Sequence, residues 1–207
     1  MPTNPPPRLL LITESPLLPN LETLVTQALG GAPFDLLLRD YQATDDRIIA
    51  LAQTLKPLLH AAGGRLLIHN RLEIAVSAGA DGLHLPESGV TTREARTRLG
   101  PLPLLGRSCH EPESARKHLL HGGDYVTLSP VFATLSHPDA FPLGTERFAA
   151  LRRRIPGPVL ALGGIGVGNV QEVMAAGATG VALIRGIFQA PNPAQTTQEL
   201  FRALQTT

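Results

Sequence analysis

The sequence predicts a single-domain (β/α)₈ TIM barrel. Eight short apolar runs recur at a steady interval along the 207 residues, and segments with helical periodicity separate them. Each run has about five residues, the usual length of a strand, and none alternates apolar with polar residues. Strands that are apolar on both faces and alternate with helices are typical of a buried parallel sheet, and eight of them match a closed barrel.

Strands are expected where aliphatic residues cluster. The runs cover residues 8–13, 34–39, 64–70, 81–85, 102–108, 124–129, 158–164 and 180–186. The alternative is an open, doubly wound sheet, which often carries a GxGxxG motif after its first strand. No such motif follows the first run, and in GGIGVGN (163–169) Asn169 stands where the last glycine would be. The even spacing therefore favours closure.

Helices are expected in the intervening segments because their apolar residues recur at helical spacing. These segments cover residues 20–29, 46–62, 72–79, 91–99, 111–123, 145–154 and 167–177. Two of them lead into a strand through the same turn, in SAGADGLHL and AAGATGVALI, as a repeating αβ unit does. His60, His118 and His121 fall on these helices or at their ends, and we expect them to be solvated.

Composition excludes several classes of protein. The formal net charge is +1 with no basic tract, and aromatic residues make up 4%, which argues against nucleic acid as a partner. The single cysteine, Cys109, excludes a disulfide framework and a zinc site of several thiolates. Residues 1–7 are expected to form a flexible, proline-rich arm before the barrel domain, 8–207. No apolar signal segment or membrane-length run is evident, so no membrane partner and a cytoplasmic location are expected.

Chemistry in such barrels sits at the carboxyl ends of the strands. Here the apolar runs end in polar residues or glycine: Thr13, Glu14, Arg39, Asp40, His69, Asn70, Arg71, His84, Ser108, Cys109, His110, Ser129, Gly163, Gly164, Arg185 and Gly186. We expect a ligand site to be built from this set.

The loops after the last two strands are candidates for a phosphate site, as they often are in this fold. Gly163 and Gly164 open one loop, and Ile184 and Arg185 open the other. Glycine lets the backbone approach a ligand, and N–H groups beside a helix start attract an anion. The other interpretation is that the two glycines only make a tight turn.

The segment SPVFATLSHPDAFPLG (129–144) is much longer than an ordinary connection and holds three prolines. Thr134, Ser136 and His137 lie in its middle, beside the predicted phosphate loops. Two hydroxyl donors and a histidine suit the same phosphate. The alternative is a proline-rich surface loop with solvated hydroxyls.

Four segments together resemble the thiamine phosphate synthase and TenI-like family. They are GADGLHL, SPVFATLSHPDAFPLG, ALGGIG and GVALIRGIF, which occur in the family's order and spacing between about residue 8 and residue 190. The loop form S-P-V-x-x-T-x-S-H-P, with GRSCH (106–110), is most similar to the TenI-like domains fused behind Nudix hydrolases.

The resemblance implies a reaction that joins a pyrimidine methyl diphosphate to a thiazole phosphate, releasing pyrophosphate. It implies a thiazole phosphate held by Gly164, Ile184, Arg185, Thr134 and Ser136, which agrees with the phosphate site expected from the loops. It also implies that Arg39 contacts the diphosphate and that Ser108 matches a serine after the fifth strand.

The chain departs from the synthases at the diphosphate site. Their two Mg²⁺-binding aspartates are replaced by Asn70, in His69–Asn70, and by Gly89, in HLPESG; a lysine is replaced by His137. A diphosphate leaving group is neutralised by a cation, and carboxylates are the chief ligands that hold it. We therefore expect weak or absent Mg²⁺-dependent coupling and no metal site, with Glu87 or Asp40 as ligands only if a synthase activity is retained.

Proton transfer is the chemistry expected of the TenI-like branch, some of whose members are thiazole tautomerases. The histidine used there falls at Pro130 in this chain, so His110, in GRSCH, becomes the leading acid–base candidate. The alternative is that His110 only caps the helix that follows it, in EPESA. Cys109 has no evident base beside it and is not expected to be a nucleophile.

Further substrate contacts are expected from polar residues at the barrel mouth. These are Arg39, Ser108, His69, Asn70, His84 and His137. His84, in GLHL, equally suits a hydrogen-bonded structural role among apolar neighbours.

Three functions remain open. The first is a TenI-like tautomerase or degenerate synthase acting on a thiazole phosphate. The second is an active synthase with an altered metal site, and the third is a protein that binds thiazole phosphate or thiamine phosphate without chemistry. Family members are often dimers, so a homodimer is an open alternative to a monomer.

Overall fold

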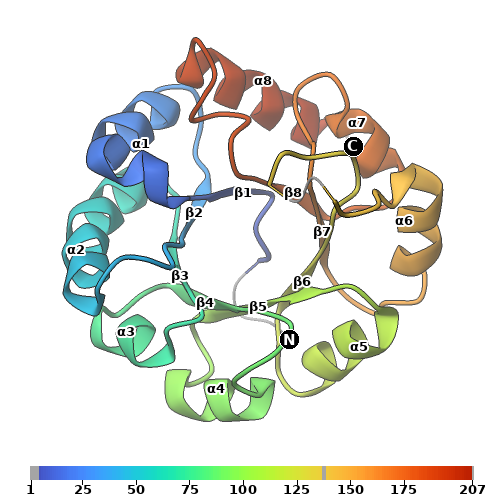
Figure 1. Ribbon diagram of the computed structural model, residues 1–207, viewed down its shortest axis with the longest axis horizontal. Coiled ribbons are helices and arrows are strands. Elements are labelled where there is room, and N and C mark those ends of the chain that lie inside the picture. Colours follow the sequence, from blue (N-terminus) through green and yellow to red (C-terminus); the bar gives the residue numbers. More distant parts are fainter. Residues whose placement is uncertain (1–4, 137–138, 207) are drawn as a thin grey trace.

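The computed structural model describes residues 5–136 and 139–206 and shows a closed barrel of eight parallel strands (Figure 1). The strands follow one another in sequence order, and the last pairs with the first. They are β1 (Leu9–Ile12), β2 (Asp35–Leu38), β3 (Leu66–His69), β4 (Gly82–Leu85), β5 (Leu104–Cys109), β6 (Tyr125–Leu128), β7 (Val159–Leu162) and β8 (Gly180–Leu183). The predicted barrel is confirmed, and each predicted run coincides with one strand, although β5 extends one residue beyond its run, to Cys109.

Helices form a ring around the barrel (Figure 1). They are α1 (Leu21–Leu29), α2 (Asp45–Ala61), α3 (Leu72–Ser77), α4 (Thr92–Leu99), α5 (Pro112–Leu120), α6 (Gly144–Arg152), α7 (Val170–Ala175) and α8 (Pro193–Gln205). The sequence patterns did not single out α8 or the short 3₁₀ helix η1 (Ser15–Asn20). In the described part of the chain, no helix is long and apolar enough to cross a membrane.

Alternate strand residues divide the core into two parts. Those that face the barrel interior form a small cluster of Leu10, Ile12, Leu37, Leu67, Leu104, Tyr125, Leu160 and Ala182. Those that face outward pack with the apolar sides of the helices in a larger cluster. The inner cluster fills the barrel, so the ligand site is restricted to the mouth.

One hydrogen-bond pattern between a side chain and a strand N–H recurs at the amino-terminal end of the barrel. Before β4, β6 and β8, the side chain of the preceding residue accepts a hydrogen bond from an N–H at the start of the strand before it. Asp81 accepts from Leu66, and Thr179 accepts from Val159, at 2.8 Å and 3.2 Å. These two residues are the variable position in the repeated turns GADG and GATG, so the repeat serves strand pairing.

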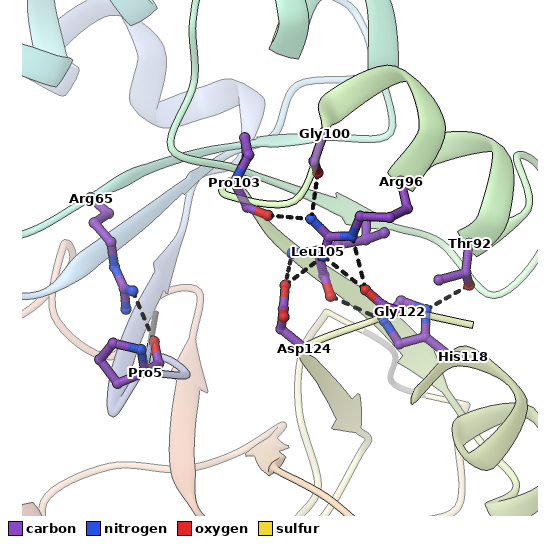
Figure 2. Close-up of polar contacts among 10 residues, drawn as sticks. All are labelled: Pro5, Arg65, Thr92, Arg96, Gly100, Pro103, Leu105, His118, Gly122 and Asp124. Carbon is purple, nitrogen blue, oxygen red and sulfur yellow. Dashed lines mark hydrogen bonds and ion pairs between the residues drawn. The ribbon is translucent and has the colours of Figure 1, made fainter. Parts of the chain in front are cut away.

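Asp124 serves the same purpose before β6 (Figure 2). Its carboxylate accepts from Leu105 N and from the Arg96 guanidinium, both at 2.7 Å. Arg96 also donates to the carbonyls of Gly100, Pro103 and Gly122, and thereby ties α4 to the turns that lead into β5 and β6. Desolvating this cation is offset by four oxygen partners.

The described end of the N-terminal segment contacts the barrel floor. Arg65 donates to the Pro5 carbonyl at 2.8 Å (Figure 2) and forms an ion pair with Asp35. Pro7 is buried. Residues 1–4 lie outside the described residues, so the extent of the predicted arm remains a prediction.

The expectation that His118 is solvated is wrong. The ring is 1% exposed, with Nε2 3.1 Å from the Leu105 carbonyl and Nδ1 2.8 Å from Thr92 Oγ1 (Figure 2). The space exists because residue 123 is glycine: a Cβ there would lie 2.1 Å from His118 Nε2. Burial is the main reason that the pKa of His118 falls to about 4.

Acid is predicted to destabilise the fold through this ring. His118 stays neutral in the folded protein down to a pKa of about 4, whereas the unfolded chain takes up the proton near 6.5. Between these values the unfolded state binds more protons, so His118 lowers the free energy of unfolding by about 1.4 kcal/mol per pH unit as the pH falls. Urea unfolding of the wild type and His118→Gln at pH 7 and pH 5 measures this. A pH dependence that is equal in the two proteins would contradict it.

Candidate functional site

A cavity of about 210 Å³ opens at the carboxyl ends of the strands. It brings together nine of the residues expected to form the site: Arg39, His69, His84, Ser108, His110, Thr134, Ser136, Gly163 and Ile184. They come from seven strands, β2 to β8, and the loops that follow them, far apart in the sequence. The inner apolar cluster lies beneath them and closes the barrel below.

A second cavity of about 200 Å³ adjoins the first, and the two share Thr134, Ser136 and Gly163 among their walls. Gly164 and Arg185 line this second cavity as well. Every described residue of the expected phosphate site therefore borders one continuous depression.

Gly163 and Gly164 both have positive φ, at 101° and 65°, which favours glycine. They also allow the long loop after β6 to approach. A Cβ on Gly163 would lie 2.7 Å from Pro130 Cβ, and one on Gly164 would lie 2.5 Å from the Ala133 carbonyl oxygen. The tight turn and the close approach are thus one feature, and a side chain at either position would push the loop out.

The loop after β6 is fastened to the start of the β7 loop. Val131 N donates to the Leu162 carbonyl and Phe132 N donates to the Gly163 carbonyl, at 2.9 and 3.0 Å. These bonds hold the segment that leads to Thr134 against the β7 loop. The Oγ1 of Thr134 lies 3.4 Å from the backbone N of Ser136. His137 lies outside the described residues.

Backbone donors at this site have no backbone acceptor. Within the described ranges, the N–H groups of Gly164 and Arg185 take part in no backbone hydrogen bond. The Arg185 side chain is turned to Glu14, whose carboxylate accepts from Arg185 Nε at 2.8 Å and from Arg185 Nη2 at 3.3 Å. This hydrogen-bonded pair raises the pKa of Arg185 and holds the β8 loop against the β1 loop. The arrangement presents N–H dipoles to an anion.

Arg39 stands on the opposite wall. Its backbone N–H donates to Thr13 Oγ1 at 2.8 Å, its Nε donates to the Thr13 carbonyl at 3.2 Å, and its guanidinium lies 5.7 Å from the Tyr41 ring centre. No carboxylate among the described residues forms an ion pair with it. It is therefore a positioned cation beside the cavity.

Two histidines line the cavity wall in the neutral form. Burial, with added repulsion from Arg39 and Arg71, lowers the pKa of His69 to about 4. Burial also lowers the pKa of His84 well below its usual value. His69 lies edge-on to Tyr41, with ring centres 5.5 Å apart, and stacks with His84 at 6.4 Å. The resulting wall is uncharged at neutral pH.

Ser108 is linked to a residue that the sequence patterns missed. Its Oγ lies 3.0 Å from His84 Nε2, and His84 Nδ1 lies 3.1 Å from the Tyr125 hydroxyl. Tyr125 is buried in the inner cluster under the cavity. The available signal was its place in an otherwise apolar strand, at an inward-facing position two residues before Thr127.

His110 is exposed at the rim and lines the first cavity. Its Nδ1 lies 3.2 Å from the Ser129 carbonyl, to which only a protonated Nδ1 can donate. That tautomer leaves Nε2 free to accept a proton. Glu87 Oε2 lies 3.8 Å from Nε2, and Glu87 Oε1 accepts from the His110 N–H at 3.3 Å. His110 therefore has the geometry of a base.

The two positions where the resemblance implies aspartates lie side by side but offer one amide. A Cβ on Gly89 would lie 4.0 Å from Asn70 Oδ1, and Asn70 itself adopts a φ of 60° outside the lining of the first cavity. Among residues 5–136 and 139–206, no cluster of three histidine, cysteine or acidic side chains is close enough to hold a metal ion.

Asp40 and Glu87, the carboxylates that could replace the two aspartates as Mg²⁺ ligands, already accept hydrogen bonds from other groups. Asp40 Oδ1 accepts from Ser15 and from the N–H groups of Gln42 and Ala43. Burial raises the pKa of Asp40, but these hydrogen bonds outweigh it and lower the pKa overall. Glu87 accepts from His110 N–H, as described above, and it lines the first cavity, which Asp40 does not. A Mg²⁺ ion held by carboxylates does not fit this arrangement.

Cys109 faces away from the cavity. It belongs to the outer cluster between barrel and helices, and burial raises its pKa to about 11. A thiol that stays protonated and buried is a poor nucleophile.

Comparison with known proteins gives a consistent match. A family model described as thiamine monophosphate synthase covers residues 9–187. A relative named putative thiamine-phosphate synthase from Geobacter sulfurreducens is 39% identical over 186 residues, which cover 89% of this chain and 87% of the relative. The thiamine-phosphate synthase of Thermosynechococcus vestitus is 36% identical over 89% of this chain, which spans 52% of that longer protein.

The fold agrees with a solved relative. A thiamine phosphate pyrophosphorylase from Pyrococcus furiosus superposes with a TM-score of 0.85 at 25% identity, and the match covers 96% of both chains. The matched family model spans all eight strands and both glycine-lined loops. The chain therefore belongs to the thiamine monophosphate synthase family.

Proposed function

We propose that the protein binds a thiazole phosphate, with the phosphate in the second cavity and the ring in the first. The observation that carries this proposal is that the N–H groups of Gly164 and Arg185, which make no backbone hydrogen bond within the described residues, lie beside the hydroxyls of Thr134 and Ser136. Dipoles from two loops and two hydroxyls suit a phosphate, and neutral, partly apolar walls suit a small ring. Ile184 and Gly163 border both cavities and would lie between ring and phosphate.

We infer that the chemistry is TenI-like proton transfer, with His110 as the acid–base residue. His110 offers a free Nε2 at the rim of the ring cavity, while the neutral His69 and His84 form its wall. Proton transfer on a bound ring releases no diphosphate, so it needs no cation to neutralise a leaving group. The absence of a carboxylate pair at Asn70 and Gly89 makes Mg²⁺-dependent coupling the less favoured reaction.

Active coupling of a pyrimidine methyl diphosphate to the thiazole phosphate is the second candidate. Relatives that are 34–39% identical carry the name thiamine-phosphate synthase, and Arg39 is a cation free to bind a diphosphate. Calorimetry of the pyrimidine diphosphate with and without Mg²⁺ separates the two candidates. If the protein is a synthase, Mg²⁺ should increase its affinity for the pyrimidine diphosphate. In the TenI-like proposal binding does not depend on it.

Binding of thiazole phosphate or thiamine phosphate without chemistry is the third candidate. It shares the phosphate cradle with the first and differs only in the role of His110. A cytoplasmic location and a homodimer belong to the same proposal, as expectations from the family.

Substituting Gly164 is predicted to weaken thiazole phosphate binding. Gly164→Ala forces a Cβ against the Ala133 carbonyl at a φ of 65°, so the loop carrying Thr134 and Ser136 must move. Losing two or more hydrogen bonds to a charged ligand lowers affinity by about a hundredfold in calorimetry. Gly166→Ala is the matched control, because nothing lies within 4 Å of a Cβ at that position. Equal affinity in the two variants would contradict the phosphate site.

Removing the His110 ring is predicted to abolish turnover and spare binding. Without its base the tautomerase rate is expected to fall by about a hundredfold or more, while calorimetry of His110→Ala gives wild-type affinity for thiazole phosphate. His121→Ala removes an exposed imidazole on the neighbouring helix end and serves as the control. An unchanged rate in His110→Ala would make that histidine structural.

A further inference from the structure

Four positions form one row across the barrel interior. The strand register pairs His69 with His84, His84 with Gly106, and Gly106 with Tyr125. Residues paired across parallel strands point to the same face of the sheet, and this row faces inward. A Cβ on Gly106 would lie 2.2 Å from Tyr125 Cζ and 2.6 Å from His84 Nδ1. Glycine at the centre of the row is what lets the phenol reach the imidazole.

The protons in this row can be counted. Tyr125 and His84 are 0% and 2% exposed. Burial raises the pKa of Tyr125 well above its usual value and lowers the pKa of His84 well below, so both are neutral at pH 7. Within the described residues, the Tyr125 hydroxyl has a single hydrogen-bond partner, His84 Nδ1. A buried hydroxyl donates wherever an acceptor is in reach, so Nδ1 accepts.

The direction of the remaining bonds follows from this step. A neutral imidazole with an accepting Nδ1 carries its proton on Nε2, which donates to Ser108 Oγ at 3.0 Å. Thr127 Oγ1, buried beside it, donates to the same oxygen at 3.4 Å. Ser108 Oγ accepts on both of its lone pairs, and its own proton is left for the cavity that the side chain lines.

We propose that Tyr125 is a positioning residue that fixes the tautomer of His84 and so makes Ser108 an obligatory hydrogen-bond donor to the bound ligand. The ligand atom at this point must then be an acceptor, such as an anionic oxygen or the lone pair of a ring nitrogen. A ligand N–H directed at Ser108 would face another donor, and no hydrogen bond could form, so such a ligand would bind more weakly. The class of ligand rests on the proposed function, whereas the direction of the Tyr125–His84–Ser108 chain does not.

Nuclear magnetic resonance of the ligand-free protein tests the chain itself. With ¹⁵N-labelled histidine, long-range proton–nitrogen correlations distinguish protonated from unprotonated ring nitrogens, and the signals that vanish in His84→Gln identify this ring. We expect an unprotonated Nδ1 and a protonated Nε2 in the wild type. We expect Tyr125→Phe, which keeps the ring volume, to mix the two tautomers. Tyr41→Phe removes a phenol hydroxyl at the cavity without touching the chain and should leave the signals unchanged.

Two results overturn the proposal. One is a protonated Nδ1 in the wild type, a measurement that does not depend on any variant folding. The other is an unchanged His84 spectrum in a folded Tyr125→Phe protein. Either would stand whether or not thiazole phosphate binds, so this test is separate from that of the proposed function.

Calorimetry with thiazole phosphate then tests the effect on the ligand. Loss of one fixed donor lowers affinity by about fivefold, so Tyr125→Phe should bind about fivefold more weakly than the wild type. In a Ser108→Ala background the same change should have no further effect, because the donor at the end of the chain is already gone. An equal loss in both backgrounds would mean that Tyr125 acts on the fold and not through Ser108.

Discussion

The closed ladder of eight parallel strands is the constraint on which the whole site depends. Its register decides which side chains face the barrel interior, and it puts an apolar floor under a polar rim. In the row of His84, Gly106 and Tyr125, the ladder places a phenol beside an imidazole because the residue between them has no side chain. A shift of one residue in β5 would point Arg107 into this space and turn Ser108 outward.

The two sides of the mouth differ in what they offer a ligand. The loops after β7 and β8 present backbone N–H groups, which attract an anion with no need for a metal. The opposite side presents Arg39, a cation with no ion-pair partner among the described residues, and has Asn70 and Gly89 where the family resemblance implies a carboxylate pair for Mg²⁺. The N–H groups of the β7 and β8 loops suit the charge of a phosphate monoester. A diphosphate, with more charge to neutralise as it leaves, is poorly served by the opposite side.

Sequence patterns predicted the strands and the residues that end them, because burial on both faces leaves a clear apolar run and polarity marks its end. They did not predict Tyr125, since its role depends on register with Gly106 and His84, and pairing across strands leaves no mark in one sequence. His118 was misjudged for a related reason: the space that buries it comes from the missing side chain of Gly123. His110 was chosen as a candidate from position alone, and its role stays a prediction; the tautomer proposed for it depends on the Ser129 carbonyl, which only the fold brings near.

The central claim is that the phosphate cradle is present while the means of neutralising a diphosphate is not. A product assay tests this most directly: the protein is mixed with pyrimidine methyl diphosphate, thiazole phosphate and Mg²⁺, and thiamine phosphate is measured over time. The account predicts no thiamine phosphate above the rate without protein, in samples where calorimetry shows thiazole phosphate bound. Formation at an enzymatic rate that depends on Mg²⁺ would contradict it, and would mean that Glu87 or Asp40 is released from its present hydrogen bonds to hold the ion.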